Sequence, residues 1–290
     1  MNEKTHTYGG QAVIEGVMIR GQRYMAVAVR RPDGGISLMK DRIGSVFTEK
    51  ARALILVRGV IALGETLILG MRALTYSANV AAESEGEEIS KSSMIAMIAI
   101  SLIITVSLFF ILPVFASKPF EGVFGSDILS NIVEAIIRLG MFVGYIFLIG
   151  RMDDIKRVFM YHGAEHMIVH VRENGQDLTI ENARKFPTAH PRCGTAFLLV
   201  VMVVAVVVLV LMPRDPLWWL LLSRVVFIPL IAALSYEVIR WSGKNSGKSW
   251  VRIVTGPSLA LQSLTTSPPN DDQIEVAIAA MEHAVEADSA

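Results

Sequence analysis

The sequence has one cysteine, Cys193, and no excess of charge of either sign. A single cysteine excludes an internal disulfide and is typical of a protein in a reducing compartment. Lys and Arg together number 27, as do Asp and Glu, so the charge balance gives no argument for a nucleic-acid partner, and we expect none. The first 50 residues lack a continuous apolar core, so we also expect no secretory signal.

Long apolar runs are abundant instead. Of the 290 residues, 52% are hydrophobic and 19% are charged. A membrane-spanning helix needs about 20 mostly apolar residues, and four stretches qualify: residues 94–115, 132–150, 196–212 and 217–239. Glu134, Arg138 and Arg224 fall inside these stretches. We expect them to form a satisfied intramembrane ion pair; the alternative is a polar translocation pathway.

The distribution of basic residues predicts the orientation of these helices. Twelve Lys or Arg residues precede residue 94, seven lie between residues 150 and 196, and four follow residue 239. The two remaining loops carry only Lys118 and Arg214. Loops rich in Lys and Arg stay in the cytoplasm. We therefore expect a multi-pass protein of the plasma membrane with four spans and both termini in the cytoplasm, with the lipid bilayer as its partner.

This topology divides the chain into six segments. Residues 1–50 are a cytoplasmic β-rich element, 51–93 an amphipathic or re-entrant helical segment with an acidic linker, and 94–150 spans one and two. Residues 151–195 are a cytoplasmic loop, 196–240 spans three and four, and 241–290 a cytoplasmic tail with a docking helix. The expected fold class is a mainly α, polytopic membrane helical bundle with a small N-terminal β element.

Local patterns support the segments outside the spans. Residues 32–35, Pro-Asp-Gly-Gly, predict a turn between two strands. Residues 54–76 are long enough to span, yet Arg58, Glu65 and Arg72 recur every seven residues and form one polar stripe. In the tail, apolar residues at helical spacing predict one buried side, made of Ile274, Ile278, Met281 and Val285.

The most informative segment is residues 161–170, which reads Y-H-G-A-E-H-M-I-V-H. His162, Glu165 and His166 form the H-x-x-E-H pattern of a class of zinc hydrolases. Histidines four residues apart lie on one face of a helix and can bind one metal, and a carboxylate beside them can act as general base. His170 extends the same stripe by one turn.

Residues 190–193, H-P-R-C, add two further donors, and imidazole with thiolate favours zinc as the cofactor. We expect the metal ligands to be His162, His166, His190 and Cys193, with Glu165 as the catalytic base. Glu237, His170 and Glu15 are candidates for an additional ligand or a supporting hydrogen bond.

Several alternatives remain open. The same histidines could form a hydrogen-bonded polar network without a metal. Cys193 could be a nucleophile or a small residue packed at a helix entry. Glu237 could pair with Arg240, and Glu15 could be a surface residue of an edge strand.

Six motifs along the chain resemble the YqhQ-like family of bacterial integral membrane proteins, a domain of unknown function. They are GGQAVIEGVMIRG at residues 9–21, YSANVAA at 76–82, YHGAEH at 161–166, HPRCGT at 190–195, YEVIR at 236–240 and QIEVAIA at 273–279. The resemblance implies a bacterial inner-membrane protein, and members are described as predicted metal-dependent enzymes. One position departs from the pattern, because a lysine is expected after YHGAEH and the residue is Met167.

Our leading hypothesis is a zinc-type, metal-dependent enzyme that acts at the cytoplasmic face of the membrane. Among enzyme classes we favour a hydrolase. The alternative is a non-enzymatic membrane scaffold or assembly factor that docks a membrane or cytoplasmic protein. The third hypothesis is a transporter that uses the intramembrane charges.

Overall fold

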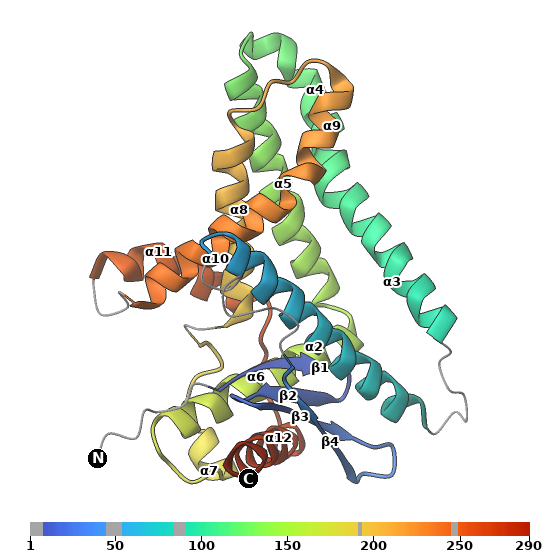
Figure 1. Ribbon diagram of the computed structural model, residues 1–290, viewed down its shortest axis with the longest axis vertical. Coiled ribbons are helices and arrows are strands. Elements are labelled where there is room, and N and C mark those ends of the chain that lie inside the picture. The colour runs from blue at the N-terminus through green and yellow to red at the C-terminus, as the bar shows by residue number, and fades with distance from the viewer. Residues whose placement is uncertain (1–7, 45–53, 84–90, 191–192, 245–248) are drawn as a thin grey trace.

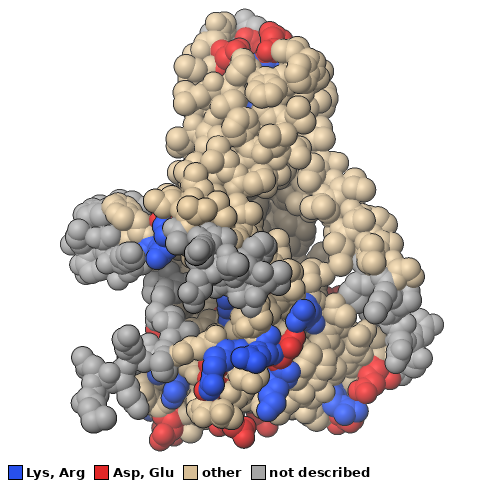
Figure 2. Space-filling model, in the orientation of Figure 1, with Lys and Arg blue, Asp and Glu red and all other residues tan. Residues whose placement is uncertain are grey.

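The computed structural model describes residues 8–44, 54–83, 91–190, 193–244 and 249–290. The protein is mainly helical and elongated, with a small sheet at one end and apolar helices rising from it (Figure 1). Figure 2 shows Lys and Arg gathered around the sheet and a largely uncharged surface over the apolar helices. The predicted acidic linker lies, apart from Glu83, outside the described residues.

The N-terminal unit is an antiparallel sheet with strand order β1-β2-β3-β4. Its strands are β1 Gly9–Val13, β2 Gly16–Arg20, β3 Tyr24–Arg30 and β4 Ile36–Arg42. The predicted turn joins β3 to β4, with Gly34 at a φ of 87° that favours glycine. The motif at residues 9–21 is a hairpin, in which Val13 pairs with Gly16 and Glu15 adopts a left-handed φ of 52°.

Helices cover both faces of this sheet (Figure 1). The helices α6 (Asp153–Glu173) and α12 (Asp271–Ser289) pack on one face, where Val17 and Ile19 belong to their core. The helix α2 (Val57–Ala82) packs on the other, where Met18 belongs to a second core. Successive side chains of a strand point to opposite faces, so the apolar run of β2 fills both cores.

The tail forms the helix that its sequence predicts. At the start of α12, the Asn270 side chain accepts from the Gln273 backbone N–H, and the Gln273 side chain accepts from the Asn270 backbone N–H. This capping box satisfies two backbone donors that the first turn of a helix leaves unpaired. Ile274 and Met281 are fully buried, so α12 docks on the chain's own sheet.

The remaining elements are mostly apolar helices. They are α3 Lys91–Val106, the π-helix η2 Ser107–Ile111, α4 Leu112–Phe124, α5 Asp127–Ile149, α7 Ile180–Ala183, α8 Gly194–Leu209, α9 Leu217–Val226, α10 Ile228–Lys244 and α11 Ser249–Gln262. Thr179 is the N-cap of the short α7, and its side chain accepts from the Asn182 N–H.

The helices support membrane association but fewer spans than expected. Among the described residues, Ile95–Glu121 and Asp127–Ile149 are long and apolar enough to cross a membrane. The pair Leu217–Val226 and Ile228–Ser242, bent by 42°, makes a third if it acts as one span. The span predicted at residues 196–212 is a shorter apolar helix, Phe197–Leu209. Two or three spans are therefore supported where the sequence predicted four.

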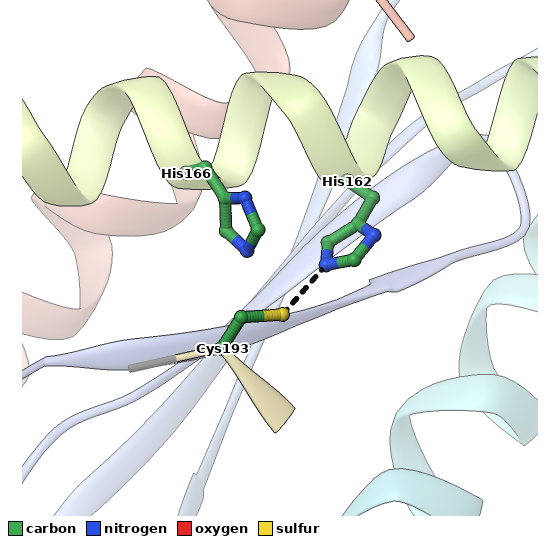
Figure 3. A group of neighbouring side chains, drawn as sticks. All are labelled: His162, His166 and Cys193. Carbon is green, nitrogen blue, oxygen red and sulfur yellow. Dashed lines mark hydrogen bonds between the residues drawn. The ribbon is translucent and has the colours of Figure 1, made fainter. Parts of the chain in front are cut away.

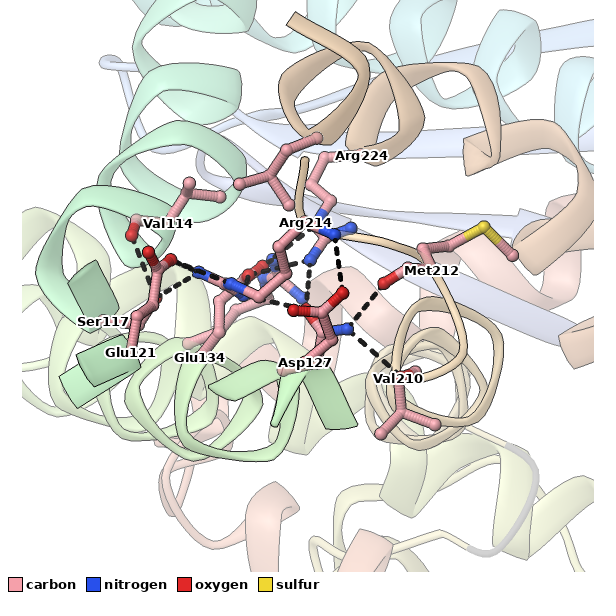
Figure 4. Close-up of polar contacts among 12 residues, drawn as sticks. Val114, Ser117, Glu121, Asp127, Glu134, Val210, Met212, Arg214 and Arg224 are labelled. Atoms are coloured by element: carbon pink, nitrogen blue, oxygen red, sulfur yellow. Dashed lines mark hydrogen bonds and ion pairs between the residues drawn. The ribbon is translucent and has the colours of Figure 1, made fainter. Parts of the chain in front are cut away.

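The charges predicted inside the spans meet in one buried cluster (Figure 4). Glu134 accepts hydrogen bonds from Arg138, Arg224 and Arg214, the last from the segment between α8 and α9. Asn131 Oδ1 accepts from Arg214 at 2.8 Å and from Arg224 at 2.9 Å. The arrangement is a satisfied ion-pair network, and Arg214 is the member that the sequence did not predict.

One hydrogen-bond acceptor of this network, the Phe109 carbonyl, lies four residues before Pro113. Pro113 has no N–H, so the Phe109 carbonyl four residues earlier loses its usual helical donor. Arg138 Nε donates to that carbonyl at 2.9 Å. Phe109 lies in the π-helix η2, and such local widening of a helix often marks a functional or strained site. The Phe109 carbonyl thus gives a buried guanidinium its hydrogen bond.

Candidate metal centre

The H-x-x-E-H motif lies on α6, and its two histidines face Cys193 at the entry to α8 (Figure 3). His162 Nε2 is 3.1 Å from Cys193 Sγ. One ligand atom from each of His162, His166 and Cys193 lies within 4.8 Å of the other two. Three of the four predicted metal ligands are therefore brought together; residues 191–192 between His190 and Cys193 lie outside the description.

Backbone carbonyls fix the rings of His162 and His166 in the same tautomer. His162 Nδ1 is 2.8 Å from the Thr265 carbonyl, and His166 Nδ1 is 2.6 Å from the Thr188 carbonyl. A carbonyl only accepts hydrogen bonds, so Nδ1 carries the proton in each ring and a neutral ring presents an unprotonated Nε2. His166 Nε2 is buried and has no hydrogen-bond partner among the described residues. Metal-binding histidines are oriented in this way, and the residues fit a metal.

The carboxylate of Glu165 lies directly beside these rings. Its Oε2 is 3.5 Å from His166 Nε2, and the residue is only 4% exposed. Burial raises the pKa of the Glu165 carboxyl to about 7, against the lowering effects of His162 and of the Gly10 backbone N–H. A carboxyl group with such a pKa can accept and return protons near neutral pH.

A cavity of about 380 Å³ opens onto this group. Its walls include Gly10 and Thr66 together with Glu165, His166 and Cys193. A Cβ at Gly10 would lie 2.6 Å from Glu165 Cγ, so only glycine lets β1 approach the carboxylate this closely. The cavity is where a substrate could meet the carboxylate and the candidate ligands.

The fourth predicted ligand, His190, lies in a neighbouring cluster. One ligand atom from each of His170, Glu173 and His190 lies within 4.8 Å of the other two, and His190 Nε2 is 3.3 Å from Glu173 Oε2. Gln262 holds the backbone of His190, since its side chain accepts from the N–H and donates to the carbonyl, each at 2.9 Å. Burial lowers the pKa of His190 to about 4, although Glu173 opposes the shift.

Two other candidate residues lie away from the histidines. Glu237 accepts from Arg58 Nε at 2.6 Å, so it pairs with α2 rather than with Arg240 or a metal ligand. Glu15 accepts from Arg157 Nε at 2.7 Å and from the Tyr161 hydroxyl at 3.2 Å. Neither carboxylate lines the cavity.

Sequence reasoning missed several residues that shape the site: Gly10, Glu173, Thr188, Thr265 and Gln262. Glu173 had a signal, because it follows His170 by three residues and so continues the helical stripe. The two threonines contribute backbone carbonyls, which every residue type possesses, so no pattern in the sequence identifies them.

Comparison with known proteins agrees with the motifs. Residues 54–287 match a family described as "Protein of unknown function (DUF1385)". The chain is 33% identical over 285 residues to "Uncharacterized protein YqhQ" of Bacillus subtilis (strain 168), covering 93% of this chain and 90% of that one. No solved structure matches. The chain therefore belongs to the DUF1385 family, to which the YqhQ-like motifs of its sequence pointed.

Proposed function

We propose that this protein is a metal-dependent hydrolase with its active site between α6 and the entry to α8. The observation that supports this most is the shared orientation of two rings. Both His162 and His166 donate Nδ1–H to backbone carbonyls, and both present Nε2 toward Cys193. A polar network without a metal would leave the buried His166 Nε2 unsatisfied, which costs about 1–3 kcal/mol.

His162 Nε2, His166 Nε2 and Cys193 Sγ would hold the ion, and imidazole with thiolate favours zinc. Catalytic zinc sites use three protein ligands and keep one position open, and this donor set has that number. Zinc supplies Lewis-acid activation of water and of a substrate oxygen when it is bound. The remaining residues of the site would position the reacting groups or transfer protons.

Glu165 is the residue that moves the proton. Its carboxylate would take a proton from the attacking water in the cavity and return it to the leaving group. The close packing of Gly10 positions the carboxylate, and burial keeps it away from bulk water. Both features are supplied by the sheet, so the chemistry depends on the packing of β1 against α6.

We also propose that the site faces the cytoplasm, in a plasma-membrane protein that has both termini inside. The support is the concentration of Lys and Arg around the sheet and the uncharged surface above it (Figure 2). A four-span arrangement requires α8 to cross with 16 residues. At about 1.5 Å per residue this helix is about 24 Å long, shorter than the roughly 30 Å hydrocarbon core of a bilayer. The bilayer would therefore have to thin locally, or the turn that follows the helix would have to lie in the membrane as well.

The test combines metal content with activity in cells. Full-length protein purified in detergent should carry zinc or another divalent ion, and His162→Ala/His166→Ala should lose it while still inserting. Glu165→Gln should keep the ion, because the amide preserves the shape, yet fail to complement a deletion of the gene. Its matched control is Glu181→Gln, at a side chain that is 89% exposed. Full complementation by Glu165→Gln at matched expression would exclude the hydrolase and leave a scaffold.

A further inference from the structure

The cluster of His170, Glu173 and His190 is the strongest feature that the first site does not use. We propose that it is a second divalent-cation site, next to the first along α6. One ligand atom from each residue lies within 4.8 Å of the other two. The cluster joins the last turn of α6 to the segment before α8, so one helix would supply ligands to both ions.

A backbone carbonyl also fixes the ring of His170, but here it accepts from Nε2 rather than from Nδ1. Its Nε2 is 3.0 Å from the Ala189 carbonyl and therefore carries the proton. The neutral ring then has its lone pair on Nδ1, and stacking on Phe186 at a centroid distance of 5.6 Å holds the plane. A hydrogen bond from one ring nitrogen to a carbonyl is the usual support of a metal-binding imidazole.

The other two donors are close to ligation geometry before any ion is added. His190 Nε2 and Glu173 Oε2 are 3.3 Å apart, and the His190 ring is 4.5 Å from that of His170. Two imidazoles and one carboxylate, with no sulfur, suit a borderline divalent ion such as zinc, manganese or iron(II). The donor set thus differs from that of the first site, which contains the thiol.

The two sites are adjacent. The rings of His166 and His190 are 5.8 Å apart between centroids, and both line the 380 Å³ cavity. A second positive charge here would stabilise negative charge that develops on a substrate in the cavity, as in two-metal hydrolases. That catalytic role rests on the proposed function, whereas binding of the second ion does not.

Cobalt(II) can count the sites separately, because the protein has one cysteine. A thiolate bound to cobalt gives a charge-transfer absorption band, so the band reports the Cys193 site alone. Full-length protein stripped with a chelator and titrated with Co²⁺ should bind two ions per chain. Glu173→Gln should bind one and keep the full band, while Cys193→Ser should bind one and lose the band. Glu181→Gln, an exposed change on α7, should still bind two.

Each result decides between the two sites. One ion with the full band in the unaltered protein overturns the second site and leaves the first. One ion without the band, lost in Glu173→Gln, supports the second site and removes the first. No ion at all removes both. If Glu173→Gln fails to fold, X-ray absorption on the unaltered protein replaces it. The average number of sulfur ligands per cobalt in a sample with two equivalents should be half that in a sample with only the Cys193 site filled. An unchanged sulfur number overturns the proposal.

Discussion

Gly10 on β1 packs directly against the carboxylate of Glu165 on α6, so that a Cβ at Gly10 would lie 2.8 Å from Glu165 Oε1. A side chain at Gly10 has no room, because its Cβ would lie 2.6 Å from both Glu165 Cγ and the Met18 carbonyl oxygen. The edge strand therefore sets the position of the proposed base, although the two residues are far apart in the chain.

Gly10→Ala should accordingly damage activity more than metal binding. The added methyl must displace Glu165 or distort the sheet, at a cost of about 1–3 kcal/mol. We expect a loss of complementation with the metal content unchanged, measured on purified protein and in cells. Gly9→Ala is the matched control, since nothing lies within 4 Å of a Cβ at Gly9. Equal behaviour of the two variants would contradict the role of this contact.

Glu134→Gln should destabilise the helical bundle strongly. Three arginines converge on this buried carboxylate, and breaking one partner out of a buried ion pair costs about 3–5 kcal/mol. Thermal unfolding in a mild detergent measures the loss. Glu181→Gln is the control, because Glu181 and its partner Lys185 are 89% and 56% exposed, and an exposed pair is worth about 1 kcal/mol or less. An equally small shift for both would show that the cluster contributes little.

Asp288 should make stability depend on pH at the acid end. Burial alone would raise the pKa of its carboxyl, but hydrogen bonds from the backbone N–H groups of Gln22, Arg23 and Tyr24 outweigh burial and lower the pKa. A lowered folded-state pKa stabilises the protein above the ordinary aspartate value of 3.8. That stabilisation is lost as the pH falls through the folded-state value.

Asp288→Asn should therefore unfold more easily at pH 7, by about 1 kcal/mol after allowance for solvent screening. The difference from the unaltered protein should shrink below pH 4. Denaturant melts at several pH values provide the measurement, with the exposed Glu286→Gln as reference. A difference that stays constant from pH 7 to pH 3 would assign the effect to shape rather than charge.

The proposed topology predicts opposite labelling of two single cysteines in a Cys193→Ser background. Val123→Cys, at a residue 73% exposed, should react with an impermeant thiol reagent added outside. Glu181→Cys should react only after the membrane is opened. Labelling of both from the same side would contradict the topology, and a Ser267→Cys probe would then report the side of the tail.

The features that the sequence predicted well are local. The stripe of histidines and the tail helix follow from helical periodicity, which acts within a few residues. Long-range pairing was not predictable in this way. Glu237 pairs with Arg58 across 179 positions, and Arg214 joins Glu134 from outside any apolar run. The division of the histidines into two clusters also depends on the position of the segment before α8 in the folded chain.

One apolar face of the sheet is covered by α12, which is synthesised long after the strands. Strands from residues 9–42 share one apolar core with α6 and with α12, which ends at Ser289. During translation the strands leave the ribosome first, and until α12 has been made only α6 can cover this apolar face. The apolar helices are synthesised in between, so the proposed spans would enter the membrane while the sheet still lacks α12. A chain that stops before residue 271 would retain every candidate ligand and still lack the helix that packs on the sheet beside α6.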